Sequence, residues 1–170
     1  MVFPSIAGTF GITGFDNVLA FPEAPRYVVL LVDGLGYDLL RDCGDAAPFL
    51  SSLLVDKPMT VGVPSTTATS LTSLGTGLAA GQHGVVGYTS RVPGTNQRLN
   101  SLKWDQPIDP RSWQPHATVL NAMMAAGIDT SVVNDAKFAE SGLTLCSQRD
   151  VPFHGVSSVW ERLDVILDQQ

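Results

Sequence analysis

The chain has 170 residues, of which 44% are hydrophobic and 15% charged, so it can bury a core and does not have the composition of a disordered segment. Sixteen acidic against ten basic residues give a formal net charge of −6, which would repel a polyanion. We therefore expect no nucleic-acid polymer among its partners. The longest clean apolar run, residues 28–32, is too short to span a bilayer, which predicts a cytoplasmic protein without a membrane partner.

The first part of the chain predicts an irregular lead-in over residues 1–25, followed by a strand and a helix. Residues 27–32 are a continuous aliphatic run, typical of a parallel strand that is buried on both faces. Asp33 stands at the end of this strand. A glycine-containing turn follows, and residues 37–41 begin a helix, which completes a strand, turn and helix unit.

A second unit of this kind is predicted around Pro64. Pro48 opens a short helix, and residues 60–63 have the character of a buried strand that Pro64 ends. The serines and threonines of residues 65–70 then supply the N-cap and first turn of a further helix, which begins near Thr67.

The remainder of the chain alternates a polar excursion with further helices and strands. Residues 88–113 are rich in polar side chains, proline and glycine, which predicts a long surface excursion with room for a small hairpin. Gln114 and Pro115 open a helix that Gly127 ends, and residues 128–133 resume a buried strand. The repeated strand–helix–strand order favours an α/β fold with a mostly parallel sheet between helices.

The C-terminal segment has the pattern of an unfinished helix. Ser158 and Glu161 have the spacing of a capping box, and apolar side chains recur at helical spacing between residues 159 and 167. No glycine, proline or basic turn follows before Gln170. We therefore expect residues 1–170 to be the N-terminal part of a single catalytic domain, encoded by a longer reading frame.

Two polar positions follow the predicted buried strands, at the edge where open α/β sheets bind ligands. Asp33 follows the first strand, and residues 65–67 follow the second. A carboxylate is a good ligand for a divalent metal, and a hydroxyl at a helix N-terminus gains from the N–H groups and dipole there. The pair suits phosphoryl chemistry. Local alternatives remain, with Asp33 as a turn residue and Thr66 and Thr67 as helix caps.

The other chemistry-bearing residues give weaker signals. The glycine pair at positions 34 and 36 lacks the third glycine of a dinucleotide-binding fingerprint, and no P-loop motif occurs. His83, His116 and His154 do not have the spacing of a self-contained metal site, so we expect them to be packed or capping histidines.

Three motifs occur in order: VVLLVDGL over residues 28–35, VPSTTATSLTSLGTG over residues 63–77, and HGVVGY over residues 83–88. Together they resemble the alkaline phosphatase superfamily, and most closely its branch of type I phosphodiesterases and nucleotide pyrophosphatases. In that branch a nucleophilic threonine lies nine residues before a Thr-Gly pair, and here that position is Thr67. The resemblance thus implies a phospho-threonine intermediate on Thr67, and it makes Asp33 the first metal-binding carboxylate.

The resemblance also implies an alkaline-phosphatase-like fold and two zinc ions, with Asp33 and Thr67 among their ligands. The family's remaining ligands come from a later stretch that includes an Asp-His pair, which this sequence does not contain, so the resemblance implies half of an active site. Members of the branch commonly have asparagine at the position of Tyr88, where it donates to the transferred phosphoryl oxygen. A phenol can also donate there. No sulfatase motif occurs.

These observations predict a metal-dependent hydrolase of phosphoric esters that acts on a small phosphorylated substrate. A monoester, a diester, a nucleotide pyrophosphate and a phosphonate all stay open as substrates, as does the oligomeric state. One alternative is a non-catalytic α/β module that binds a nucleotide or phosphate. Another is an inactive fragment, because Asp33 and Thr67 alone cannot close a metal site that typically needs four donors.

Overall fold

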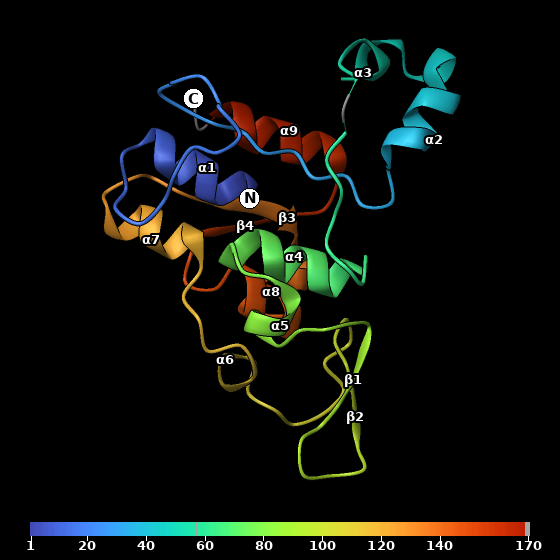
Figure 1. Ribbon diagram of the computed structural model, residues 1–170, viewed down its shortest axis with the longest axis vertical. Coiled ribbons are helices and arrows are strands. Elements are labelled where there is room, and N and C mark those ends of the chain that lie inside the picture. The colour runs from blue at the N-terminus through green and yellow to red at the C-terminus, as the bar shows by residue number, and fades with distance from the viewer. Residues whose placement is uncertain (57, 169–170) are drawn as a thin grey trace. The chain divides into compact units, whose positions relative to one another are not determined.

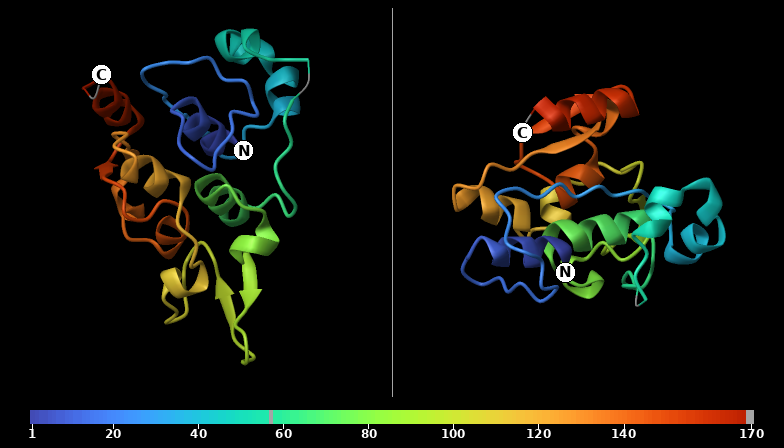
Figure 2. Two further views of the ribbon diagram at one scale, coloured as in Figure 1. Left: turned by 60° about the vertical axis from the view of Figure 1, so that its left-hand side comes forward. Right: turned by 90° about the horizontal axis from the view of Figure 1, so that it is seen from above.

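In the computed structural model, which describes residues 1–56 and 58–168, the chain is divided between two units. The larger unit combines Met1–Pro25 with Gly62–Gln170, and the smaller unit comprises Arg26–Val61. Figures 1 and 2 show the helices and strands that make up each unit.

The N-terminal segment contains a helix, α1 (Val2–Thr9), where the sequence predicts an irregular lead-in. Four consecutive residues of this helix, Pro4 to Ala7, are buried. The helix packs against α4 (Thr67–Thr76) and α7 (Val119–Ala125). No side chain caps α1, so its sequence carries no start signal. A helix this short is stabilised by tertiary packing, which the local sequence does not reveal.

Helix α4 begins where the sequence predicts. Thr66 is its N-cap, and Gly77 ends it in the left-handed conformation with φ of 72°, which glycine adopts without a Cβ clash. Besides α1 and α7, the helix packs against α5 (Ala80–His83) and α8 (Gly142–Ser147). It therefore packs against four other helices of the larger unit (Figure 1).

A small apolar core joins the first turn of α4 to α8. It consists of four buried residues, Ala68, Val85, Leu143 and Cys146, with three partly buried side chains packed against them, Leu71, Trp104 and Trp113. The two tryptophan rings meet edge to face with their centroids 6.5 Å apart. The core therefore fixes the start of α4 beside the segment that carries Val85.

Two pairs of strands are described, and they do not form the large parallel sheet between helices that the sequence predicts. β1 (Thr89–Arg91) and β2 (Arg98–Asn100) make an antiparallel hairpin within the predicted surface excursion. β3 (Val132–Asp135) pairs in parallel with β4 (Phe153–Val156). This mixture of helices and small sheets is compatible with an α/β fold (Figure 1).

The predicted C-terminal helix is present as α9 (Val159–Asp168), which packs against both β3 and β4. Ser158 accepts a hydrogen bond from the Glu161 N–H at 3.1 Å, as a capping box requires. The Glu161 carboxylate accepts from the N–H and the hydroxyl of Ser157, both at 2.7 Å, and not from Ser158. The predicted helix start is confirmed, with the reciprocal bond shifted by one residue.

The helix predicted from Gln114 begins later than expected. A short helix, α6 (Pro110–Trp113), precedes Gln114, and α7 begins only after Thr118. The Thr118 hydroxyl accepts from the Asn121 N–H at 3.1 Å, which satisfies a donor that the helix start would leave unpaired. Gly127 follows the helix with φ of 82°, as predicted, and the next strand is β3, displaced from the predicted residues 128–133.

The smaller unit contains the two predicted helices, α2 (Tyr37–Asp42) and α3 (Pro48–Ser52), joined by the 3-10 turn η1 (Gly44–Ala46). The strand predicted over residues 27–32 is not formed, and the side chains of residues 28–32 are 41–65% exposed. A strand needs the hydrogen bonds of a neighbour and burial of its side chains. The described part of this unit contains no second strand that could provide them.

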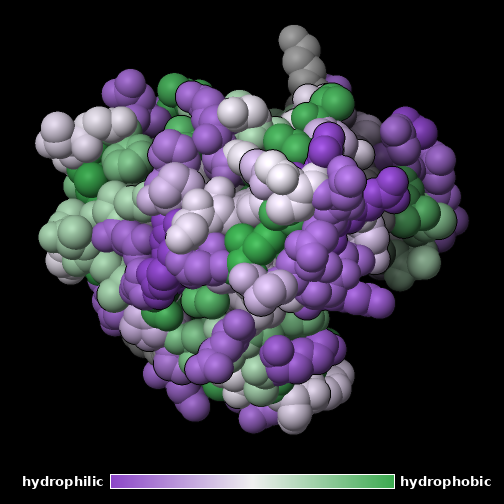
Figure 3. All heavy atoms as spheres, turned by 90° about the horizontal axis from the view of Figure 1, so that it is seen from below, coloured by the Kyte–Doolittle hydropathy of each residue, from purple (hydrophilic) through white to green (hydrophobic). Residues whose placement is uncertain are grey.

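The second predicted strand, residues 60–63, also lacks strand structure, and Val63 is 89% exposed. Exposed apolar side chains are therefore common in this chain. On the face that Figure 3 shows, they occur in small groups separated by polar residues.

Among the described residues, no helix is both long enough and apolar enough to cross a membrane.

Candidate functional site

Thr66 and Thr67 are neighbours at the N-terminus of α4, and they occupy different positions in it. Thr66 is the N-cap, whose hydroxyl accepts a long hydrogen bond of 3.4 Å from the Thr69 N–H and donates to the Thr69 hydroxyl at 3.0 Å. Thr67 is the first helical residue, where the N–H groups and dipole of the helix favour a negatively charged group. The capping interpretation therefore holds for Thr66, while Thr67 is the first residue of the helix itself.

Asp33 lies in the smaller unit, in a turn with Gly34. Gly34 has φ of 76°, a left-handed conformation that explains why glycine follows the aspartate here. Thr67 belongs to the larger unit, so the two expected metal ligands are positioned by different parts of the chain. Their joint role as ligands stays a prediction.

His83 is packed, as predicted. It ends α5 and is only 1% exposed. Its Nε2 lies 2.8 Å from the hydroxyl oxygen of Ser73 on α4, and its Nδ1 accepts a hydrogen bond of 3.2 Å from the Val85 N–H. Gly84, with φ of 78°, makes the tight turn between the imidazole ring and Val85. His83 thus contacts two separate segments through its two ring nitrogens.

The bond from Val85 decides the tautomer of His83. A backbone N–H can only donate, so Nδ1 is the unprotonated nitrogen, and Nε2 carries the proton and donates it to Ser73. Burial, with a smaller contribution from His116, lowers the pKa of His83 and favours the neutral ring. Ser73 and His83 are therefore not a nucleophile and its base, because Nε2 has no lone pair to accept the Ser73 proton.

Tyr88 leads into the β1–β2 hairpin and is 48% exposed. Its carbonyl oxygen accepts from the Ser101 N–H at 2.9 Å, and the Ser101 hydroxyl donates to the Gly87 carbonyl at 2.9 Å. These two bonds fix the backbone on which the phenol is carried. The side chain is available to donate a hydrogen bond to an anionic oxygen.

The other two histidines lie elsewhere in the larger unit. The Nε2 of His116 is 3.1 Å from the carbonyl oxygen of Gln82, and His154 is a half-buried residue of β4. Within residues 1–56 and 58–168, no three side chains of the types His, Cys, Asp or Glu come together as a metal ion requires. The described residues do not form a self-contained metal centre.

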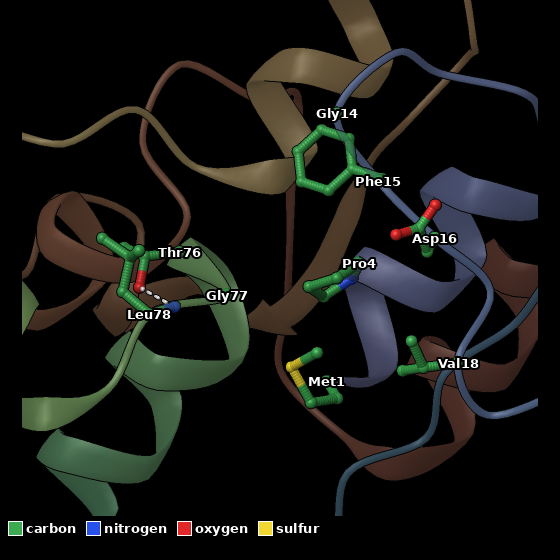
Figure 4. A pocket seen from close by; sticks show the side chains of 9 residues that line it. All are labelled: Met1, Pro4, Gly14, Phe15, Asp16, Val18, Thr76, Gly77 and Leu78. Carbon is green, nitrogen blue, oxygen red and sulfur yellow. Dashed lines mark hydrogen bonds between the residues drawn. The ribbon is translucent and has the colours of Figure 1, made fainter.

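A pocket of about 300 Å³ opens at the C-terminal end of α4. Its lining residues come from α1, from residues 14–18 and from the end of α4, where the Leu78 N–H donates to the Thr76 hydroxyl at 3.2 Å (Figure 4). A helix of 10 residues is about 15 Å long. The pocket and Thr67 are therefore at opposite ends of the helix, and the pocket is not part of the candidate site.

A buried polar network links α8 to the segment before α7. Arg149, 6% exposed, donates to the carbonyl oxygens of Gln114, at 2.6 Å, and of His116. The Gln114 side chain donates to the Cys146 carbonyl at 2.7 Å. All these acceptors are backbone carbonyls, which indicates a structural network. Arg149 and Gln114 are 35 positions apart, so no local sequence signal marks them.

The sequence profile of the family described as type I phosphodiesterase / nucleotide pyrophosphatase matches residues 27–170. The chain belongs to this family. No curated protein and no solved structure gives a significant match to it. The matched range includes Asp33, Thr67, His83 and Tyr88, and the match confirms the resemblance carried by the three sequence motifs.

Membership in the type I phosphodiesterase / nucleotide pyrophosphatase family supports hydrolysis of phosphodiester or pyrophosphate bonds as the general activity. The roles of Asp33, Thr67 and Tyr88 as individual residues stay predictions.

Proposed function

We propose that the protein hydrolyses phosphoric esters through a covalent phospho-threonine on Thr67. The observation that carries this proposal is the place of Thr67 in a member of a phosphodiesterase family. Thr67 is the first residue of α4, while its neighbour Thr66 serves as the cap. The N-terminus of a helix favours the anionic phosphoryl group that Thr67 would receive.

Two successive displacements at phosphorus account for hydrolysis. In the first, the Thr67 oxygen attacks phosphorus, the bond to the leaving oxygen breaks, and the hydroxyl proton passes to solvent. In the second, water attacks the same phosphorus, the bond to Thr67 breaks, and the threonine oxygen regains a proton. Throughout, the Tyr88 phenol would donate a hydrogen bond to an oxygen of the transferred phosphoryl group.

We also propose Asp33 and Thr67 as ligands of zinc, with two ions in the complete site. Carboxylate and hydroxyl oxygens are donor types that fit zinc. Zinc needs four donors, and the described residues hold no further cluster of three, so these two residues supply part of the coordination. Zinc bound to the threonine oxygen would lower the pKa of the hydroxyl and make the alkoxide accessible.

Trapping the covalent intermediate tests this proposal. The protein, loaded with zinc, is mixed with bis(p-nitrophenyl) phosphate, quenched in acid, digested, and analysed by mass spectrometry. We expect a nitrophenyl-phosphoryl adduct on Thr67, absent in Thr67→Ala and retained in Thr66→Ala. Turnover without an adduct on Thr67 contradicts the proposal, and an adduct on Thr66 shows that the motif is misplaced by one residue.

If the protein is instead a non-catalytic binding module, we expect different results in these measurements. Such a module would bind inorganic phosphate without a metal and would release no nitrophenol from the diester. Zinc stoichiometry, measured on the dialysed protein and on Asp33→Asn, separates the two functions. We expect the aspartate variant to retain less zinc, because it replaces a charged ligand with a neutral one.

A further inference from the structure

The HGV segment of the third sequence motif has no part in the proposed displacements. His83, its histidine, is buried, its two ring nitrogens bond to Ser73 and Val85, and it belongs to no metal cluster among the described residues. Burying an imidazole has a cost in free energy unless its nitrogens are hydrogen-bonded. Both nitrogens of His83 are bonded, and the identity of their two partners indicates what the residue does.

One partner belongs to the helix that carries Thr67. The Nε2–H donates to Ser73, which lies in α4 less than two turns beyond Thr67. A helix is stiff over this length, so the bond that holds Ser73 in place also holds Thr67 in place. The core provides a second attachment nearby, because Ala68 and Val85 belong to the same buried cluster.

The other partner belongs to the segment that carries Tyr88. The Val85 N–H donates to Nδ1, three residues before Tyr88. On the far side of this segment, Ser101 bonds to the carbonyl oxygens of Gly87 and Tyr88. The backbone that leads to the phenol is thus held at one end by His83 and at the other end by the hairpin.

We infer that His83 is a positioning residue, which fixes the segment bearing Tyr88 relative to the helix bearing Thr67 through the chain Ser73, His83 and Val85. This inference rests on the proposed function, in which Thr67 attacks and Tyr88 donates to the transferred phosphoryl oxygen. The HGV segment thus has a structural role, which is to hold Thr67 and Tyr88 in position relative to each other. Neither general-base chemistry at Ser73 nor metal binding by His83 is compatible with the tautomer that the Val85 bond requires and with the two bonds of the ring.

Three variants break the two bonds separately. In His83→Asn the amide oxygen occupies the place of Nδ1 and can still accept from Val85, while the bond to Ser73 is lost. In His83→Gln the longer amide can still donate to Ser73, while the bond to Val85 is lost. Ser73→Ala removes only the bond to the helix. His116→Gln is the matched control, because the same substitution is made at an exposed histidine that bonds to neither Ser73 nor Val85.

Steady-state hydrolysis provides the first measurement. We expect kcat to fall about 10- to 100-fold in the three variants, with KM little changed, because misplacement of a group that acts in the transition state affects the chemical step. Combined with Tyr88→Phe, each loss should be smaller than in the wild-type background, because both changes act through the same phenol. Full multiplicative losses in the double variants, or wild-type kcat in His83→Gln, would overturn the inference.

Amide hydrogen exchange provides a second measurement that needs no turnover. In His83→Gln we expect exchange at Val85 to rise about tenfold and Tyr88 to become more mobile, with the amides of α7 unchanged. Unchanged exchange at Val85 overturns the inference. If the wild-type protein hydrolyses no ester, the proposed function fails by itself, and this second measurement still decides whether His83 holds the Tyr88 segment.

Discussion

Thr66 and Thr67 are adjacent residues of the same type, and their substitution should have opposite consequences. Thr66→Ala removes the cap of α4 and should lower the free energy of unfolding by about 1 kcal/mol while most of the turnover remains. Thr67→Ala should abolish turnover, because it removes the nucleophile while Thr66, the cap of α4, stays in place. Urea denaturation and ester hydrolysis measure both effects, and equal losses of activity would show that Thr67 is not the nucleophile.

His83 should make the stability of the protein depend on pH. Burial lowers the pKa of the folded imidazole, so below its ordinary pKa, about 6.5, the unfolded chain binds a proton that the folded chain does not. The contribution of His83 is therefore complete above about pH 6.5 and is lost as the pH falls. Urea denaturation at pH 7.5 and 5.5 should show a larger loss of stability in wild type than in His83→Gln, and equal losses would contradict this assignment.

At the scale of elements, the contact between α4 and α8 depends on a residue without a side chain. A Cβ at Gly75 would lie 1.8 Å from the carbonyl oxygen of Ser147, which is far inside van der Waals contact. Gly75→Ala should therefore lower the free energy of unfolding by about 2 kcal/mol, although alanine is the better helix former.

Gly81, in α5, is the matched control. A Cβ there meets no heavy atom within 4 Å, so Gly81→Ala should leave stability unchanged or raise it by up to about 1 kcal/mol. Thermal unfolding of the two variants measures the difference. A Gly75→Ala protein as stable as wild type would show that the two helices separate easily, contrary to the close packing described.

The elements that sequence reasoning located are those with local signals. Thr66 and Gly77 bound α4, Pro48 opens α3, and Gly127 ends α7, each through a backbone requirement that a residue type satisfies by itself. Helix α1 has no such signal, so the sequence predicts an irregular segment in its place. The start of α7 was misplaced because Thr118, and not Gln114, satisfies the free N–H groups of that helix.

At the scale of the whole molecule, the two units differ in how much they bury. None of the described residues between 26 and 61 is buried, whereas α4, α7 and α8 each contain several buried residues. Hydrogen exchange should therefore be fast throughout the smaller unit and slowed by orders of magnitude in these three helices. Strong protection over residues 28–32 would show that the predicted strand forms in solution.

The two proposed zinc ligands belong to different units, so a zinc site that they share would be a property of the whole molecule. Two oxygens that bind one zinc ion each lie about 2 Å from it. A crystal structure of the protein with zinc should therefore place a carboxylate oxygen of Asp33 and the Thr67 hydroxyl within about 6 Å of each other. Zinc bound to one of these residues without the other would contradict a shared site.

The sequence by itself determined the family, the N-terminus of α4 and the hairpin, because each depends on residue types at short, fixed spacing. Tertiary structure alone decided the tautomer of His83, the buried network of Arg149 and the need for glycine at position 75, since these depend on partners distant in the chain or on another element. It also decided the structure of residues 27–32, whose aliphatic pattern shows only that they are capable of forming a buried strand. That capacity is realised only where a neighbouring strand supplies hydrogen bonds and a packed surface excludes water.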